Sequence, residues 1–219
     1  MPFTKPRVLI TAGSTKEFID PVRFITNASS GKTGYFLSME ALSDGAMVTL
    51  VMGGADPLPD FPDKIRNKIK IIRVETTRQM YRAVKDNIGG SDIFISVAAV
   101  CDYRPENPRR TKIKKGRGSV RINLVPTEDI LKATGGLKNK LKVGFALETG
   151  GLIRNAVAKL REKNLDIIVA NPHTSTGGDL TRGYIIDREL NVRPFGRITK
   201  RRFAAMLWPY IKKKWKEKI

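Results

Sequence analysis

A polar loop that contains two glycines has the residue types expected of a phosphate-binding segment. It spans Arg23–Gly34 and reads RFITNASSGKTG. It follows the apolar segment Arg7–Ala12 and leads into Lys32–Leu42, whose pattern predicts a helix. The first backbone N–H groups of a helix have no partner within it and can hold an anion. The loop therefore indicates nucleotide or phosphate-ester chemistry, and these residues are candidates for the phosphate cradle: Gly13, Ser29, Ser30 and Gly31.

Two common nucleotide-binding motifs are absent. The segment SSGKTG resembles the end of a P-loop, but the pattern GxxxxGK[ST] requires glycine where Thr26 stands. The dinucleotide pattern GxGxxG is missing because Gly13 stands alone, and no acidic residue ends the second predicted strand. Neither an ordinary P-loop NTPase nor an NAD-dependent enzyme is supported.

Composition predicts a soluble intracellular protein. Of 219 residues, 41% are hydrophobic and 28% are charged, which is typical of a globular domain with one full core. No apolar run is long enough to cross a bilayer. Cys101 is the single cysteine, so no internal disulfide can form, and a reducing cytoplasm is expected.

The chain is strongly basic, with 41 Lys and Arg against 21 Asp and Glu and a net charge of +20. Such a balance favours polyanionic partners, including nucleic acid. Eight basic residues fall within Arg104–Arg121, where Glu106 is the only acid. We interpret that segment as a functional loop, because it lies between apolar strands. A second run, Lys212–Lys218, suits the solvated end of a helix.

Alternating apolar runs and amphipathic segments predict a three-layer, Rossmann-like, doubly wound α/β domain with a mostly parallel sheet. It occupies residues 1–219, with an arm at about 103–124. Pro209 is expected to kink or break the last helix. The expected strands are Arg7–Ala12, Ala46–Met52, Lys70–Val74, Asp92–Val97, Lys142–Leu147, Asp166–Ala170 and a hairpin of Tyr184–Asp187 with Val192–Phe195. The expected helices are Lys32–Leu42, Thr77–Ile88, Leu152–Lys163 and one around Phe203–Ile211.

Five segments in unbroken order between Arg7 and Asn171 resemble a known family. They read DPVRFITNASSGKTG, AAVCDYRP, KIKK, VGFALET and KLREKNLDIIVAN. They are similar to phosphopantothenoylcysteine synthetase of the prokaryotic type, which joins 4′-phosphopantothenate to cysteine in coenzyme A biosynthesis. In many prokaryotes this domain is fused behind a flavin-dependent decarboxylase. The chain resembles a stand-alone synthetase or an excised domain, which a separate phosphopantothenoylcysteine decarboxylase would follow in the pathway.

The resemblance implies a two-step ligase reaction with CTP as co-substrate and Mg²⁺ on its phosphates. The phosphopantothenate carboxylate attacks the α-phosphate and releases pyrophosphate, and the cysteine amine then displaces CMP from the acyl-cytidylate. The resemblance also implies a cytoplasmic homodimer whose arms pair across a two-fold axis, with no membrane partner. The catalytic residues that it implies are Asn27, Asp102 and Lys112, and Asp102 is also the candidate metal contact.

The resemblance assigns further residues to the ligands. For the substrate they are Arg23, Asn27, Ala98, Ala99 and Asp102. For the nucleotide they are Gly13, Ser29, Ser30, Gly31, Asp102, Lys112, Thr127, Asp129, Ile130, Phe145, Lys159 and Lys163. Structural alternatives stay open: an Asx turn at Asn27, a surface ion pair for Arg23, a core aromatic at Phe145, and a solvated basic face for Lys159 and Lys163.

Two other functions remain open from the sequence. One is a basic nucleic-acid-binding protein that uses the arm, which explains the net charge but not the polar groups at the strand ends. The other is an ATP-dependent ligase for another phosphorylated acid, because its phosphate and activation sites would look alike. His173, the only histidine, follows Pro172 in a predicted loop and cannot form a metal site alone.

Overall fold

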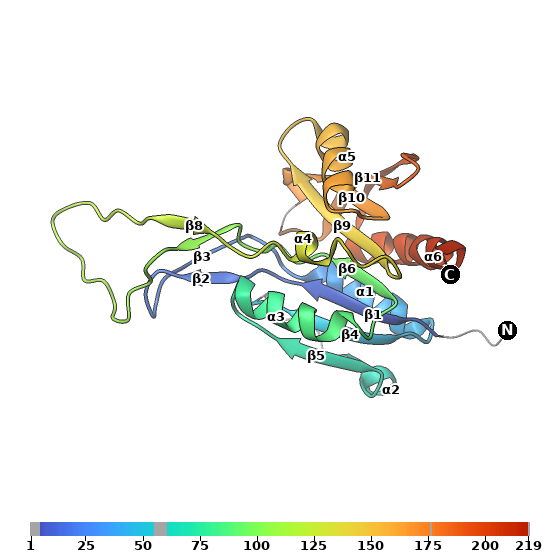
Figure 1. The fold of residues 1–219 in the computed structure, drawn as a ribbon, viewed down its shortest axis with the longest axis horizontal. Helices are drawn as coiled ribbons and strands as arrows, with labels where there is room; N and C mark the ends of the chain where they lie inside the picture. Colours follow the sequence, from blue (N-terminus) through green and yellow to red (C-terminus); the bar gives the residue numbers. More distant parts are fainter. Residues whose placement is uncertain (1–4, 55–60, 176, 219) are drawn as a thin grey trace.

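The computed structural model describes residues 5–54, 61–175 and 177–218. One mixed sheet of eight strands runs through it, in the order β12-β11-β10-β9-β6-β1-β4-β5. Figure 1 shows this sheet between helices, with a long arm projecting to one side. The predicted three-layer, Rossmann-like architecture is confirmed.

Six strands of the sheet are parallel to one another, and each is a short, mainly apolar run. They are β1 (Arg7–Ala12), β4 (Met47–Met52), β5 (Ile69–Arg73), β6 (Ile93–Ser96), β9 (Leu141–Glu148) and β10 (Ile167–Pro172). The hairpin of β11 (Leu180–Asp187) and β12 (Val192–Thr199) adds two antiparallel strands at one edge. It turns beside Leu190, whose φ of 64° is left-handed. These strands lie within a few residues of their predicted positions.

Helices cover both faces of the sheet. The helices α1 (Lys32–Ser43) and α6 (Lys200–Lys218) pack on one face. On the other face lie α3 (Thr77–Ile88), α4 (Ile130–Thr134) and α5 (Leu152–Glu162). Two short helices complete the set, α2 (Asp63–Arg66) and the 3₁₀ turn His173–Ser175. The expected threonine cap of α3 is Thr76, whose side chain and Gln79 form a capping box.

The helix α1 lies unusually close to strand β1 because Gly34 has no side chain. A Cβ atom built on Gly34 would lie 2.4 Å from the Cβ of Ala12. Any larger residue would push the helix away from the strand. The same contact fixes where the N-terminus of α1 lies relative to the end of β1.

Pro209 is expected to kink or break the last helix, and a break is wrong, because α6 continues through this residue. Proline lacks an N–H, so the carbonyl of Ala205 one turn earlier loses its helical partner. Both Ala205 and Pro209 are exposed, so water can hydrate that carbonyl. The buried face of α6, including Leu207 and Trp208, packs on the sheet and holds the helix together.

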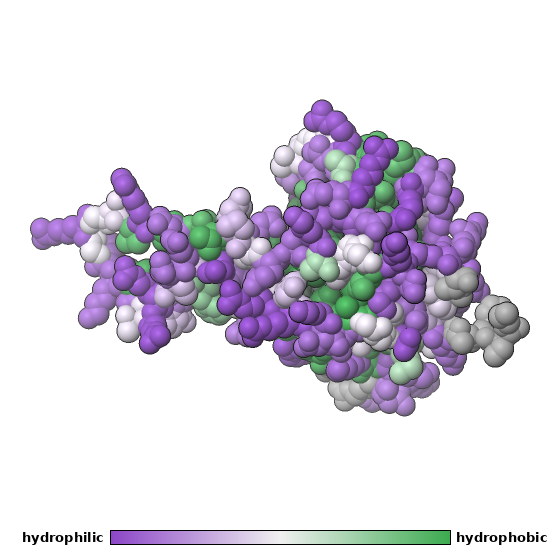
Figure 2. Space-filling view, viewed as in Figure 1, coloured by the Kyte–Doolittle hydropathy of each residue, from purple (hydrophilic) through white to green (hydrophobic). Residues whose placement is uncertain are grey.

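Two small hairpins that the sequence did not predict form the base of the arm. They are β2 (Lys16–Phe18) with β3 (Phe24–Thr26), and β7 (Tyr103–Pro105) with β8 (Leu124–Pro126). The arm continues beyond β7 and β8 as irregular chain (Figure 1). Figure 2 shows hydrophobic residues among the hydrophilic ones on its surface. No helix among the described residues is long and apolar enough to cross a membrane.

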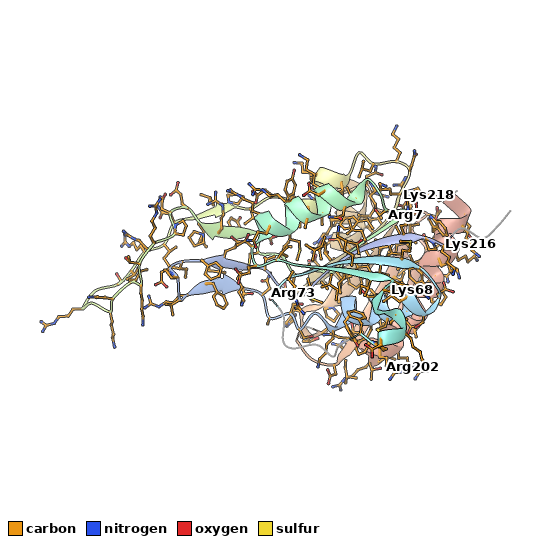
Figure 3. All side chains as sticks on the ribbon, turned by 90° about the horizontal axis from the view of Figure 1, so that it is seen from below. Arg7, Lys68, Arg73, Arg202, Lys216 and Lys218 are labelled. Atoms are coloured by element: carbon orange, nitrogen blue, oxygen red, sulfur yellow. The ribbon has the colours of Figure 1, made fainter. Side chains whose placement is uncertain are left out.

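Basic side chains also occur at the end of the molecule opposite the arm. Figure 3 shows Arg7, Lys216 and Lys218 there. Two of them are paired: Arg7 contacts Asp92 at 3.1 Å, and Lys218 contacts Asp166 at 2.7 Å. Basic side chains therefore lie at both ends of the molecule and are not confined to the arm.

A buried carboxylate ties the edge hairpin to α6. Asp187, whose side chain is 1% exposed, accepts hydrogen bonds from the Asn191 backbone at 2.9 Å and the Tyr210 hydroxyl at 2.8 Å, and pairs with Lys214 at 3.1 Å. Burial alone would raise the pKa of Asp187, but these partners lower it well below its usual range. Burial and Asp187 raise the pKa of Tyr210 to about 12.

We expect Asp187→Ala to lower the free energy of unfolding by about 1–3 kcal/mol, because it leaves buried donors without an acceptor. The folded pKa lies below the unfolded one, so this stabilisation is present above about pH 4 and disappears as the pH falls through the folded pKa. Urea unfolding at several pH values measures it. Glu189→Ala is the control, since its exposed carboxylate contacts the same Lys214 and should change the free energy by less than about 0.5 kcal/mol. Equal losses in both variants would contradict the assignment.

Candidate functional site

A cavity of about 420 Å³ opens beyond the carboxyl ends of the parallel strands β6, β9 and β10. This is the edge of an open α/β sheet where ligands bind. Its walls come from the N-terminus of α1, the loops after β3 and β6, the ends of β9 and β10, and residues of α5 and α6. Eight predicted site residues line it: Asn27, Ser29, Gly31, Ala98, Ala99, Asp102, Phe145 and Lys159.

The side chain of Asn27 joins the loop before α1 to the loop after β6. Its Nδ2 donates to the carbonyl oxygens of Val100 at 2.8 Å and Ala99 at 3.2 Å. The amide nitrogen of Asn27 is thus engaged with backbone carbonyls. To donate to a negatively charged oxygen of a ligand, Asn27 must exchange one of these bonds for one to the ligand.

The loop after β6 is held by buried hydroxyl groups below the cavity. The Thr15 hydroxyl accepts from the Cys101 backbone at 2.8 Å and pairs with the Thr77 hydroxyl at 2.9 Å. Thr127 donates to the Cys101 carbonyl at 2.6 Å. Burial raises the pKa of the Cys101 thiol, which favours a structural role for this residue. The predicted site residue Thr127 therefore supports the loop from beneath.

Asp102 is the only acid among the described residues that line the cavity. Its side chain is exposed, and its backbone carbonyl accepts from Thr127 at 2.9 Å. The carboxylate makes no hydrogen bond within the described part of the chain, so its lone pairs are available to a ligand or a metal ion. Those residues contain no cluster of three acids, cysteines or histidines that could hold a metal alone.

Lys159 reaches the cavity from α5 and donates to the Phe145 carbonyl at 3.0 Å. Burial lowers its pKa, and the nearby carboxylates of Asp102 and Glu148 partly oppose that shift. The Phe145 ring packs edge-on against Phe203, with centroids 6.3 Å apart. Phe145 thus serves both as a wall of the cavity and as part of the core.

The N-terminus of α1 faces the cavity without a side-chain cap. Gly31 stands at the N-cap with a left-handed φ of 72°, and the first turn has no acidic residue. Ser30, immediately before it, is 4% exposed, and its hydroxyl has no hydrogen-bond partner among the described residues. An uncapped helix start of this kind is suited to an anion.

Several predicted residues lie outside the cavity lining. Asp129 caps α4 and pairs with Lys163 at 2.8 Å. The carboxylate and the ammonium group are therefore each less available to a ligand. Burial would raise the Asp129 pKa, but Lys163 lowers it, and the same pair raises the pKa of Lys163. Ile130 is buried in the core, and Gly13 makes the turn at the end of β1, where its φ is 79°.

Arg23 and Lys112 belong to the arm region, away from the cavity of their own chain. Arg23 pairs with Asp20 at 3.1 Å and donates to the Ile113 carbonyl at 2.8 Å. Burial would raise the Asp20 pKa, but backbone donors, first among them Ile113, lower it. Lys112 lines a separate hollow within the arm. A single chain therefore does not bring Arg23 or Lys112 to the site.

Sequence reasoning missed two lysines of the cavity, Lys32 and Lys200. Lys32 belongs to the GKTG motif, so its motif position could have identified it. Lys200 starts α6 and is separated from every motif, so only the fold brings it here. The lining also contains Asn171 and Thr181, whose side chains are 3.0 Å apart.

The sheet, the helix start and the polar cavity define an α/β domain of the kind that binds nucleotides or phosphate esters. Residues 3–214 match the family described as DNA/pantothenate metabolism flavoprotein C-terminal domain, and the chain belongs to that family.

Two curated relatives illustrate the similarity. A cysteine/cysteine sulfinic acid decarboxylase from an unknown prokaryotic organism is 44% identical over 93% of this chain and 57% of its own length. The coenzyme A biosynthesis bifunctional protein CoaBC of Thermococcus kodakarensis is 37% identical over 94% of this chain and 51% of its own length. The chain thus spans about half the length of the curated relatives it matches.

Two solved structures share the fold. The C-terminal domain of a CoaBC protein has a TM-score of 0.81 and 36% identity, and covers 97% of this chain and 96% of its own. The H337A mutant of Cab2, in complex with phosphopantothenate-cysteine, has a TM-score of 0.77 and 17% identity. The match covers 97% of this chain and 87% of the Cab2 chain. The second shows the fold alone.

Proposed function

We propose that this chain is a phosphopantothenate–cysteine ligase that activates 4′-phosphopantothenate with CTP. The observation that carries the proposal is the convergence of Asn27, Ala98, Ala99, Asp102 and Lys159 on one cavity. Motifs far apart in the sequence supply these residues, and they are the ones that the synthetase resemblance assigns to substrate and nucleotide. Its family, and the similar CoaBC C-terminal domain that covers nearly the whole chain, support the same reaction.

The first step joins the carboxylate to the α-phosphorus of the nucleotide. The bond to the pyrophosphate oxygen breaks, and pyrophosphate leaves with the electron pair. All of these species are anionic, so the main tasks of the protein are to position them and to neutralise charge. Lys159, Lys32 and the uncapped start of α1 supply positive potential around the cavity.

In the second step the cysteine amine attacks the acyl carbonyl and displaces the nucleoside monophosphate. Negative charge develops on the carbonyl oxygen. The Asn27 amide is fixed at the mouth of the cavity by Ala99 and Val100, so it can transfer one N–H bond from backbone to that oxygen. This gives Asn27 a role that needs no charge and no covalent intermediate on the protein.

Magnesium fits the site only as a partner of the nucleotide. Asp102 is the one carboxylate among the described lining residues, and Mg²⁺ bound by one carboxylate normally keeps substrate phosphates among its ligands. The ion would neutralise phosphate charge there. Asp102 would be its protein ligand among the described residues that line the cavity.

The arm supports a shared site in a homodimer. Its region exposes large apolar side chains that a single chain leaves uncovered: Val22, Phe24, Tyr103, Val120, Ile122 and Leu124. Pairing with a second copy would bury them and gain favourable transfer free energy. It would also carry Arg23 and Lys112 to a neighbouring cavity, which their own chain does not do.

The reaction order provides the first test of function. Pyrophosphate release should occur with 4′-phosphopantothenate and CTP before cysteine is added, and cysteine should make it catalytic. We expect Asn27→Ala to slow the second step by roughly 100-fold, as is usual for loss of one oxyanion donor. Single-turnover kinetics with labelled CTP measures both steps. Release of inorganic phosphate and a nucleoside diphosphate would exclude this mechanism, and tight salt-dependent nucleic-acid binding without turnover would favour the alternative.

Mixed dimers provide a test of assembly. Arg23→Ala and Asp102→Asn proteins should each be nearly inactive. After subunit exchange, activity should recover to about a quarter of wild type, because half of the dimers are mixed and each has one intact site. Turnover before and after exchange measures the recovery. A fully active monomer, or no recovery despite verified exchange, would contradict the shared site.

Nucleotide choice provides a test of Lys112. An ammonium can only donate, so it suits the carbonyl oxygen and ring nitrogen of cytosine, whereas adenine has no carbonyl. The loss of a partner for a buried donor costs about 1–3 kcal/mol, or roughly ten- to a hundredfold in affinity. Lys112→Gln should therefore reduce kcat/KM for CTP much more than for ATP. Lys115→Gln, on the same arm, is the control; equal use of ATP and CTP by the wild-type protein would refute the role of Lys112.

A further inference from the structure

Lys200 is a buried cation that has no anionic partner among the residues that the structure describes. It is 7% exposed and lines the cavity at the start of α6. Its ammonium group makes no hydrogen bond or ion pair with any described residue. Its backbone N–H donates to the Asp179 carbonyl at 2.8 Å. A lysine is rarely buried without a partner, because desolvation of its charge is costly.

The surroundings of Lys200 are positive. Burial lowers its pKa, Lys32 lowers it further, and Asp179 opposes the shift. Lys32 pairs with Asp179 at 2.5 Å, but that carboxylate is 72% exposed and therefore lies largely in water. Nearby, the start of α1 has no side-chain cap, and the buried Ser30 hydroxyl has no partner among the described residues. Lys200, Lys32 and the start of α1 thus line one cavity, and each can bind an anion.

We propose that Lys200, with Lys32 and the start of α1, forms a subsite for the pyrophosphate part of the nucleotide. Two ammonium groups and a helix N-terminus match an anion with several negative charges. The other anion of the reaction, the phosphate monoester of the acid, has its own candidate in Arg23. This inference rests on the proposed function and adds to it a residue from α6 that holds the leaving group.

The subsite has a direct role in the first step. As the α-phosphorus gains the carboxylate oxygen, the oxygen that bridges to the β-phosphate takes the electron pair of the breaking bond. The additional negative charge then resides on pyrophosphate, beside Lys200. The ammonium group of Lys200 is held in the buried wall of the cavity. It therefore stabilises that charge more in the transition state than in the ground state. Lys200 should therefore affect kcat as well as pyrophosphate affinity.

Binding of inorganic pyrophosphate to the full chain tests the subsite without any catalytic turnover. We expect Lys200→Met to raise the Kd for pyrophosphate by at least roughly tenfold, since it removes a charge-assisted contact. Lys200→Arg should keep most of the affinity. Lys213→Met is the matched control, because Lys213 lies on the same helix with a side chain that is 70% exposed, and it should bind as wild type does. Isothermal titration calorimetry measures all four proteins.

Parallel titrations separate the two possible sources of the anion. If Lys200→Met weakens 4′-phosphopantothenate and leaves pyrophosphate unchanged, the lysine serves the substrate phosphate and the proposal is wrong. Unchanged affinity for both ligands also overturns it. The proposed function fails separately, if wild-type protein binds pyrophosphate through Lys200 yet releases none from CTP and 4′-phosphopantothenate.

Chemical protection provides a measurement that does not depend on the folding of a variant. Reductive methylation of the wild-type chain, read by mass spectrometry, should label Lys213 equally with and without pyrophosphate. Pyrophosphate should reduce labelling of Lys200 and Lys32 at least threefold. Equal labelling of Lys200 in both conditions, at a concentration that calorimetry shows to be saturating, would overturn the proposal.

Discussion

The whole site depends on the hydrogen bonds that pair the backbone polar groups of the loop after β6. This loop carries Ala98, Ala99 and Asp102, and it can keep its shape only if its polar groups have partners away from water. The buried hydroxyl of Thr15 and the half-buried hydroxyl of Thr127 bind the Cys101 backbone, and the Asn27 amide donates to the carbonyls of Ala99 and Val100. Side chains from three separate segments therefore hold the loop in one position.

The second feature of the site is its excess of positive charge. Among the described residues, Lys32, Lys159 and Lys200 line the cavity against one acid, Asp102. Burial lowers the pKa of both Lys159 and Lys200, because desolvation disfavours the charged form of a lysine. Such an arrangement costs folding free energy, and binding of a polyanion offsets that cost.

The arm is the region through which one chain would contribute residues to the site of a second copy. Its region exposes apolar side chains, and its basic residues line a hollow of their own. Arg23 contacts both Asp20 and the Ile113 carbonyl, so it links the loop before α1 to the arm. A second copy that covers the apolar surface would thus place both Arg23 and Lys112 at once.

The sequence by itself determined the strands of the large sheet and the longer helices, because continuous apolar runs and 3.6-residue periodicity depend only on local order. The sequence also predicted Asn27, Asp102 and Phe145 as site residues, because they stand in recognisable motifs at strand ends, and all three line the cavity. Only the tertiary structure decided that α6 passes through Pro209, because exposure of the Ala205 carbonyl is a property of packing. It also decided the pairing of Asp129 with Lys163 and the place of Lys200, 173 positions after Asn27 in the chain. Such contacts join residues distant in sequence, and no local pattern encodes them.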